Sequence, residues 1–114
     1  MTNNMKDCLK EAEDYNKTGF NHTMSMITGR YKLTVLYAIY RHETIRFNEL
    51  QRYLNILSHK TLSSTLKELE KDNLVLRKEY PQIPPKVEYS LSKKGRSFIP
   101  ILYAMCEWGE KYIK

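Results

Sequence analysis

The chain contains little of what marks a secreted or membrane protein. Among its 114 residues are two cysteines, Cys8 and Cys106, which are too few for a disulfide scaffold and lack zinc-ligand spacing. No apolar run approaches the roughly 20 residues that a membrane-spanning helix needs. The polar N-terminus, MTNNMKDCLKEAEDY, has no apolar centre of the kind found in signal peptides. We therefore expect a cytoplasmic protein without a membrane partner.

The motifs of catalysis and cofactor binding are missing as well. None of the histidines, His22, His42 and His59, has a Cys, Asp or Glu partner at metal-ligand spacing. The sequence contains no glycine-rich phosphate loop and no nucleophile elbow. We expect no enzymatic activity, no metal and no cofactor. His42 is instead expected to cap the end of a helix.

What remains is the composition of an ordinary globular domain with an excess of basic residues. The chain is 41% hydrophobic and 28% charged, with a net charge of +6. This composition and length predict one domain spanning residues 1–114. Between Arg77 and Arg96, six basic side chains stand against two acidic ones. Such a balance suits a polyanionic partner, although charge alone does not define a fold.

The first 46 residues are predicted to be mainly helical. Residues 6–15 have a short apolar side, and residues 16–21 form a break with Gly19 as the terminator. Apolar side chains at three- and four-residue spacing predict one central helix over residues 23–41. Gly29 inside it is explained either by a close helix crossing or by a bend. Residues 43–46 are expected to form a short strand that pairs with a later hairpin.

Residues 45–91 are the most informative part of the chain. A short helix begins at Phe47, and residues 54–57 form a turn. Ser58 is a good N-cap for a second helix over residues 58–72, which ends at Asn73 in the left-handed conformation. Strands are predicted over residues 74–80 and 87–91, joined by a proline-rich tip at residues 81–85.

The chain is expected to end in a helix over residues 93–113, capped by Ser92. Pro100 is tolerated in its first turn or two, with or without a kink. Its apolar stripe, together with that of residues 6–15, is larger than one small core is expected to bury, which favours a dimer. The alternative is that both helices only cover their own domain. The fold class is mainly α with a small antiparallel β-hairpin: a winged helix-turn-helix with extra N- and C-terminal helices for dimerisation.

The helix over residues 58–72 has two contrasting sides. Leu62, Leu66 and Leu69 face the core, while the opposite side is polar and carries short side chains. On an isolated helix this would indicate only a solvent-exposed side. The preceding helix and the following basic hairpin favour DNA contact instead. The predicted DNA-binding residues of this helix are Ser58, His59, Lys60, Thr61, Ser63, Ser64 and Lys67. The acidic residues Glu68, Glu70 and Asp72 are read as a solvated helix end.

The hairpin is predicted to contact phosphates through Lys78 and Lys86, which flank its tip. Arg77 is expected to pair with Glu88 across the hairpin. The alternative is that the proline-rich tip is only a stiff loop protecting a sheet edge.

The segments ITGRYKLTVLYAI, IRFNELQRYLNILSHKTLSSTLKELEKDNLVLRKEY and IPPKVEYSLSKKG, followed by Trp108 and Gly109, resemble the HxlR-type winged-helix regulators, relatives of the MarR group. The resemblance covers about residues 24–109. It implies a bacterial transcription regulator that acts as a homodimer on a pseudo-palindromic operator in double-stranded DNA.

Some members of that family sense oxidants or electrophiles through a cysteine just ahead of the central helix. Here that region reads KTGFNHT and contains no cysteine, and Arg30-Tyr31 replaces the family's usual Lys-Trp pair. Cys8 is a candidate for a displaced thiol sensor if a nearby cation lowers its pKa. Cys106, on the apolar side of the last helix, is expected to be an inert core group. The small-molecule effector is unknown.

We therefore predict a sequence-specific DNA-binding transcriptional regulator. The alternative is a winged-helix module that binds protein and has no specific affinity for DNA. Such a module would need a less polar recognition helix than the one over residues 58–72.

Overall fold

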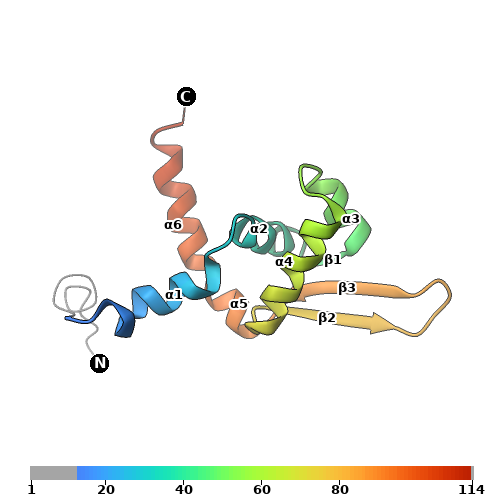
Figure 1. The fold of residues 1–114 in the computed structure, drawn as a ribbon. Coiled ribbons are helices and arrows are strands. Elements are labelled where there is room, and N and C mark those ends of the chain that lie inside the picture. The colour runs from blue at the N-terminus through green and yellow to red at the C-terminus, as the bar shows by residue number, and fades with distance from the viewer. Residues whose placement is uncertain (1–12, 114) are drawn as a thin grey trace. The chain divides into compact units, whose positions relative to one another are not determined.

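The computed structural model describes residues 13–113, whose contacts divide the chain into two compact units. The first unit ends at Arg30 and the second begins at Tyr31. Figure 1 shows the elements of both units along the chain. Within the described residues, no helix combines the length and apolar character that a membrane crossing requires.

The first unit contains a 3-10 helix, η2 (Tyr15–Lys17), and the helix α1 (Gly19–Ile27). The hydroxyl of Thr18 caps α1 by accepting a 2.9 Å hydrogen bond from the backbone N–H of Asn21. Gly19 therefore begins a helix, whereas we had predicted that it ends one. Most of the predicted helix over residues 6–15 lies outside the described residues, and its last residue, Tyr15, belongs to η2.

The predicted central helix is wrong as a single element. Its sequence forms α1 and a separate helix, α2 (Lys32–His42), because the chain turns at Gly29 with φ 145°. That conformation is accessible to glycine but not to residues with a Cβ. The prediction that His42 caps a helix is confirmed, since its Nδ1 lies 2.8 Å from the carbonyl oxygen of Ala38.

The helix-turn-helix consists of α3 (Phe47–Tyr53) and α4 (His59–Lys71). Their connection includes a hydrogen bond of 3.0 Å from the N–H of Leu57 to the carbonyl of Leu54. Asn73 follows α4 with φ 62°, as predicted, because asparagine tolerates the left-handed conformation that turns the chain into the next strand.

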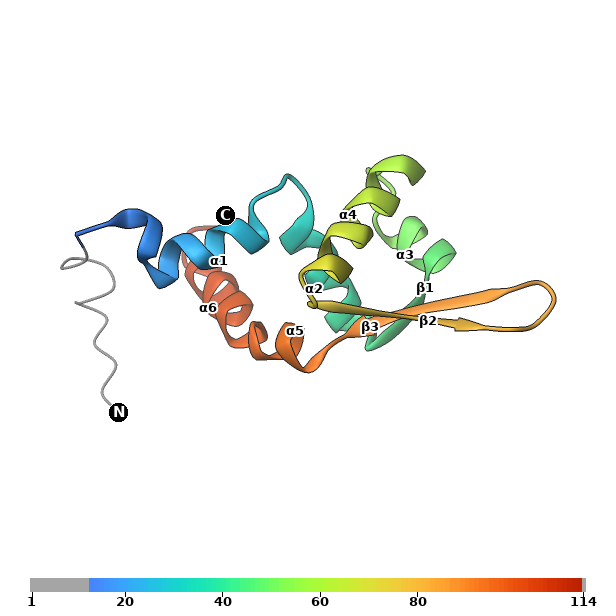
Figure 2. The same cartoon turned by 60° about the horizontal axis from the view of Figure 1, so that its bottom comes forward.

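The sheet has three antiparallel strands in the order β1-β3-β2. They are β1 (Thr44–Arg46), β2 (Val75–Tyr80) and β3 (Lys86–Leu91). Ile45 pairs with Tyr89, which confirms the predicted strand beside the hairpin. The β2–β3 hairpin, the wing, extends beyond the helices in both Figure 1 and Figure 2.

The base of the wing is fixed where the chain enters α5 (Lys93–Ser97). The hydroxyl of Ser92 accepts a hydrogen bond of 2.9 Å from the N–H of Gly95 and donates one of 2.6 Å to the carbonyl of Asn73. A Cβ at Gly95 would lie 2.1 Å from the carbonyl oxygen of Leu74, so only glycine fits there. The predicted cap at Ser92 is confirmed.

The predicted helix over residues 93–113 is also divided in two. It forms α5 and α6 (Ile99–Glu110), with Pro100 in the first turn of α6. Proline has no N–H to donate to a preceding turn, and its ring clashes with the carbonyl four residues earlier. The helix therefore restarts next to Pro100.

The second unit has one apolar core, to which its helices and its sheet both contribute. The fold is mostly helical with a small antiparallel sheet, as predicted for a winged helix. Fully buried side chains come from α2, α3 and α4: Val35, Leu36, Ala38, Ile39, Leu50, Leu62, Leu66 and Leu69. Burying one Val, Leu or Ile side chain contributes about 1.5–3 kcal/mol of stability. The leucines of α4 therefore hold this helix in place within the second unit.

Candidate nucleic-acid interface

The helix α4 begins at a well-formed cap. The hydroxyl of Ser58 accepts a hydrogen bond of 3.0 Å from the N–H of Thr61 and donates one of 3.0 Å to the Thr61 hydroxyl. Both side chains are thereby committed to shaping the first turn. Any role in DNA binding would come mainly through the position that they give to the free N–H groups of that turn.

The two sides of α4 differ as predicted. Leu62, Leu66 and Leu69 are at most 1% exposed and face the core. Among the predicted contact residues, His59, Lys60, Ser64 and Lys67 are exposed, while Thr61 and Ser63 are half-buried. The structure thus brings these side chains together on the outer side of one helix.

Lys60 and Lys67 carry the free positive charge of this surface. No carboxylate in residues 13–113 forms an ion pair with either lysine. They are seven residues apart, which is about two helical turns and about 10 Å along the axis, so they lie on one side. His59 packs against the ring of Phe47 on α3, with 4.8 Å between centroids, which fixes it at the junction of the two helices.

One buried lysine, Lys32, was not predicted from the sequence. Lys32 on α2 is only 7% exposed, and its Nζ lies 3.4 Å from a carboxylate oxygen of Glu68 and 3.9 Å from one of Asp72. Glu68 and Asp72 are therefore not merely a solvated helix end, as we had predicted. The only sequence signal was a lysine set within the apolar pattern of α2, where a buried charge needs a partner.

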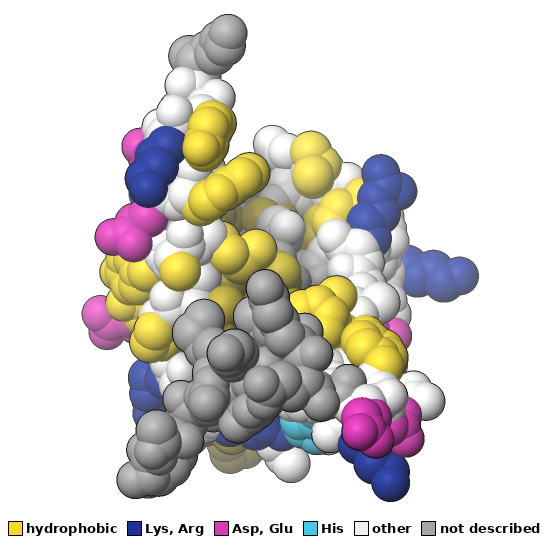
Figure 3. Space-filling view, turned by 90° about the vertical axis from the view of Figure 1, so that its left-hand side faces the viewer, with side chains coloured by type: hydrophobic (Ala, Val, Ile, Leu, Met, Phe, Trp, Pro, Cys, Tyr) yellow, Lys and Arg dark blue, Asp and Glu magenta, His cyan; other side chains and the backbone are white. Residues whose placement is uncertain are grey.

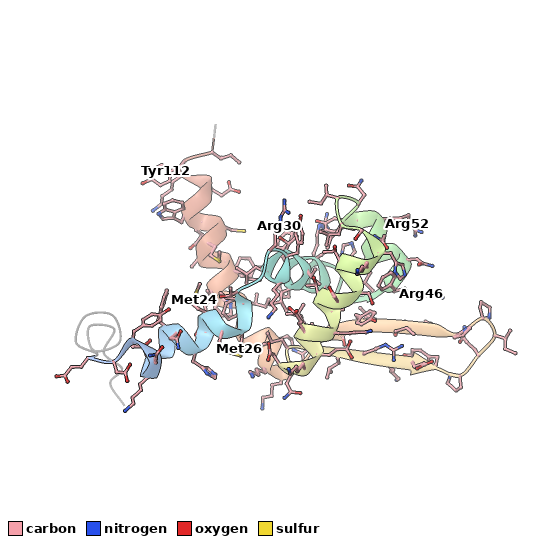
Figure 4. All side chains as sticks on the ribbon, viewed as in Figure 1. Met24, Met26, Arg30, Arg46, Arg52 and Tyr112 are labelled. Carbon is pink, nitrogen blue, oxygen red and sulfur yellow. The ribbon has the colours of Figure 1, made fainter. Side chains whose placement is uncertain are left out.

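Two arginines, one just before α3 and one in its last turn, add to the positive charge of the helix-turn-helix. Arg46 precedes the helix and Arg52 lies in its last turn; both side chains are exposed. Figure 4 labels both side chains, Arg46 at the end of β1 and Arg52 on α3. Neither arginine was among the DNA-binding residues predicted from the sequence. Exposed arginine side chains are suited to contact with DNA phosphates.

The wing lysines differ in their surroundings. The Nζ atoms of Lys78 and Lys86 lie 4.9 and 4.8 Å from the ring centroid of Tyr80. Lys86 also forms an ion pair of 3.1 Å with Glu88, which accepts a hydrogen bond of 3.0 Å from the Tyr80 hydroxyl. The hydrogen bond from Lys86 is the largest cause of the lowered pKa of Glu88. Lys86 is therefore partly neutralised.

The predicted pairing of Arg77 with Glu88 is wrong. The register places Arg77 opposite Tyr89 and Lys78 opposite Glu88. Arg77 instead forms an ion pair of 3.3 Å with Glu79 on its own strand, because alternate residues of a strand share one side. Among the described residues, no ion pair engages Lys78.

The helix α6 exposes an apolar side on the isolated chain. Figure 3 shows hydrophobic side chains along it, and Tyr112 projects from its far end in Figure 4. The exposed residues Ile101, Met105, Trp108 and Tyr112 recur at the spacing of one helical face. Sequence patterning identified the stripe but could not say whether its own domain covered it.

The two cysteines have different outcomes. Cys106 is exposed, so the prediction of an inert core thiol is wrong for this chain by itself. It lies on α6, most of which projects from the core. Cys8, the candidate sensor, lies outside the described residues.

Comparison with known proteins agrees with this geometry. The model of the HxlR-like helix-turn-helix family matches residues 26–114. An HTH-type transcriptional regulator of Halalkalibacterium halodurans is 50% identical over 106 residues, covering 93% of this chain and 91% of the relative.

Two solved structures have similar folds. One, described as a transcriptional regulator of the MarR family from Porphyromonas gingivalis, has a TM-score of 0.83 and 31% identity, covering 90% of this chain and 98% of its own. The redox regulator HypR in its oxidized form has a TM-score of 0.76 and 39% identity, covering 83% and 97%. These relatives are regulators rather than enzymes.

Proposed function

Because the chain belongs to the HxlR-like helix-turn-helix family and is a transcriptional regulator, we propose that it binds double-stranded DNA sequence-specifically as a homodimer. The observation that carries this proposal is the outer side of α4, a helix that the core holds in place. There Lys60 and Lys67, which form no ion pair within residues 13–113, flank small hydroxyl side chains. As a DNA-binding transcriptional regulator, it would act in the cytoplasm.

In the proposed complex, α4 lies in the major groove. Lys60 and Lys67 reach guanine edges or phosphates, and Ser63 and Ser64 allow the helix axis to approach the bases. His59 stands at the first turn, where the capped helix N-terminus attracts phosphate. Ser58 and Thr61 support that turn through their mutual hydrogen bonds.

The wing contributes phosphate contacts beside the groove. Lys78 is the stronger of the two wing candidates because Lys86 is already paired with Glu88. Arg46, at the end of β1, and Arg52, on α3, supply further positive charge. Together these side chains would account for a sequence-independent part of the affinity.

The homodimer forms through the exposed apolar side of α6. Trp108 is 68% exposed on the single chain, and a large aromatic side chain at the centre of an interface is a common anchor. Two copies related by a two-fold axis would present two α4 helices to major grooves roughly 34 Å apart. That arrangement requires a pseudo-palindromic operator.

A response to oxidants is a second proposal, favoured by the similarity to the redox regulator HypR and by the exposed thiol of Cys106. In this proposal Cys8 is the sensing thiol. Mass spectrometry of the DNA-competent protein after diamide treatment tests it. An unmodified Cys8 would end the proposal that Cys8 is the sensing thiol and leave DNA binding unaffected.

A salt titration of binding to genomic operator fragments tests the main proposal. Neutralised phosphates release counterions, so log affinity should fall steeply and linearly with log salt concentration. Affinity that hardly changes with salt, or no binding to DNA, would favour the protein-binding alternative.

A further inference from the structure

A cavity of about 490 Å³ that opens widely to solvent lies between α2 and α6 and has no part in the proposed DNA contact. Its volume falls within the roughly 300–1,000 Å³ typical of small-molecule sites. The helix α2 contributes Tyr37, Tyr40 and Arg41, and α6 contributes Tyr103 among others. All of its lining residues belong to the second unit.

Aromatic rings form much of the cavity wall. Tyr40 and Tyr103 meet edge to face with 6.1 Å between ring centroids, and their hydroxyl oxygens are 3.2 Å apart. Tyr37 lies one helical turn before Tyr40 and is also half exposed. The faces of such rings carry negative potential and attract cations.

A glutamate with a strained backbone, Glu43, lies beside these rings. Glu43 lines the cavity and ends α2 with φ 65°. A residue with a Cβ is disfavoured in that conformation, and glycine would relieve the strain. Within residues 13–113, no ion pair neutralises the Glu43 carboxylate. The chain thus keeps a negative charge at this position despite a backbone cost, and such outliers concentrate at ligand clamps and switches.

We propose that this cavity binds a small organic cation, such as a quaternary ammonium group that carries an aromatic substituent. Glu43 would balance the charge, the three tyrosines would supply cation–π contacts, and Ile99 and Leu102 would cover the apolar part. A metal ion is a poorer fit, since one carboxylate and phenol groups do not make an oxygen cage.

Arg41 does not argue for an anionic ligand. Its guanidinium carbon lies 5.5 Å from the ring centroid of Tyr53 on α3, and its positive charge is thus already placed over an aromatic face. His42 packs on the same ring, with 4.7 Å between centroids. A carboxylate ligand would also be repelled by Glu43.

The contact of Arg41 with Tyr53 gives the cavity a route to the DNA-binding helices. A cation bound beside Arg41 would repel its guanidinium and alter the contact with α3, which packs beside α4. Occupancy would then change the affinity for DNA. This regulatory step rests on the proposed DNA-binding function, whereas ligand binding does not.

Calorimetric titration of the full-length protein without DNA tests the site directly. Benzyltrimethylammonium is the probe, and phenylacetate is its anionic counterpart. We expect saturable binding of the cation and little binding of the anion. Glu43→Gln should weaken cation binding roughly tenfold, the effect of losing one partly exposed charge pair.

Two further variants separate a lost site from a damaged fold. Glu43→Gly removes the carboxylate and relieves the positive φ, so it should raise the melting temperature and still weaken cation binding. Glu107→Gln, on α6 but outside the cavity lining, should leave binding unchanged. Absence of saturable binding, equal affinity for phenylacetate, or unchanged affinity in Glu43→Gln would overturn the proposal.

A second measurement addresses regulation. The cation should shift the DNA affinity of the wild-type protein and have no effect on Glu43→Gln at the same concentration. Cation binding without a shift in DNA affinity would overturn the regulatory role alone. Failure to bind DNA in the absence of the cation would contradict the proposed function and leave the calorimetric result standing.

Discussion

The ammonium group of Lys32 lies 3.4 Å from the carboxylate of Glu68, and this contact joins α2 to the helix proposed to enter DNA. The two partners are unequally buried: the side chain of Lys32 is 9% exposed and that of Glu68 is 58% exposed. Removing Lys32 and removing its carboxylate partners should therefore reduce the free energy of unfolding by different amounts.

Removing the carboxylates should destabilise the protein more than removing the lysine. Glu68→Gln combined with Asp72→Asn leaves a buried ammonium without an anion, and we expect a loss of about 3 kcal/mol in the free energy of unfolding. Lys32→Met leaves carboxylates that water can solvate, and should cost less than half as much. Urea unfolding measures both, with Glu70→Gln as the matched control on α4. Equal losses in the two variants would contradict the assigned burial of the pair.

Ser58 offers a way to separate the stability of α4 from its affinity for DNA. Ser58→Ala removes the cap and should cost about 1 kcal/mol of stability. Ser58→Asp keeps a capping acceptor, so its stability should stay near wild type. It also places a negative charge where the proposal puts a phosphate, and its DNA affinity should fall. Thermal unfolding and fluorescence anisotropy give the two quantities. If Ser58→Asp binds DNA as tightly as wild type, the first turn of α4 does not approach the backbone.

The wing lysines should contribute unequally to binding. Lys78→Ala should weaken binding to all sequences and reduce the magnitude of the salt slope by about one. Lys86→Ala should have a smaller effect, because Glu88 already partly neutralises the charge of Lys86 in the wild-type protein. Salt titrations of the two variants provide the comparison. A larger change in Lys86→Ala would show that the ion pair with Glu88 opens in the complex.

The apolar side of α6 should hold the dimer together. Trp108→Asp places a charge in the proposed interface, so the protein should become monomeric while staying folded, since this side chain is 68% exposed on one chain. Analytical ultracentrifugation gives the mass and circular dichroism gives the fold. Glu107→Ala, a neighbouring substitution off the stripe, should remain dimeric. A dimeric Trp108→Asp would place the interface elsewhere.

The order of elements could be predicted from the sequence because local signals agree there. Ser58, Asn73 and Ser92 each have a specific capping or turn geometry, and the leucines of α4 have one periodicity. The positions at which helices are interrupted were harder to predict. Apolar spacing continues through Gly29 and Phe98, so periodicity did not reveal that the chain turns at both positions.

Pairings between distant segments could not be predicted. Glu68 and Asp72 have the composition of a solvated helix end, and only the packing of α2 on α4 brings Lys32 to them. The partner of Arg77 depended on the strand register, which a sequence pattern does not fix to one residue. The exposure of Cys106 follows from the projection of α6, which the apolar stripe alone did not indicate.

The proposed function depends most on contact between the outer side of α4 and DNA bases. Binding of Lys60→Ala and Ser64→Ala to a library of operator variants tests it most directly, with Lys71→Ala, at the end of α4, as the control. We predict that the first two variants lose affinity and change their preference among base pairs, while the control keeps the wild-type preference. Unchanged affinity and unchanged preference in both variants would contradict the claim.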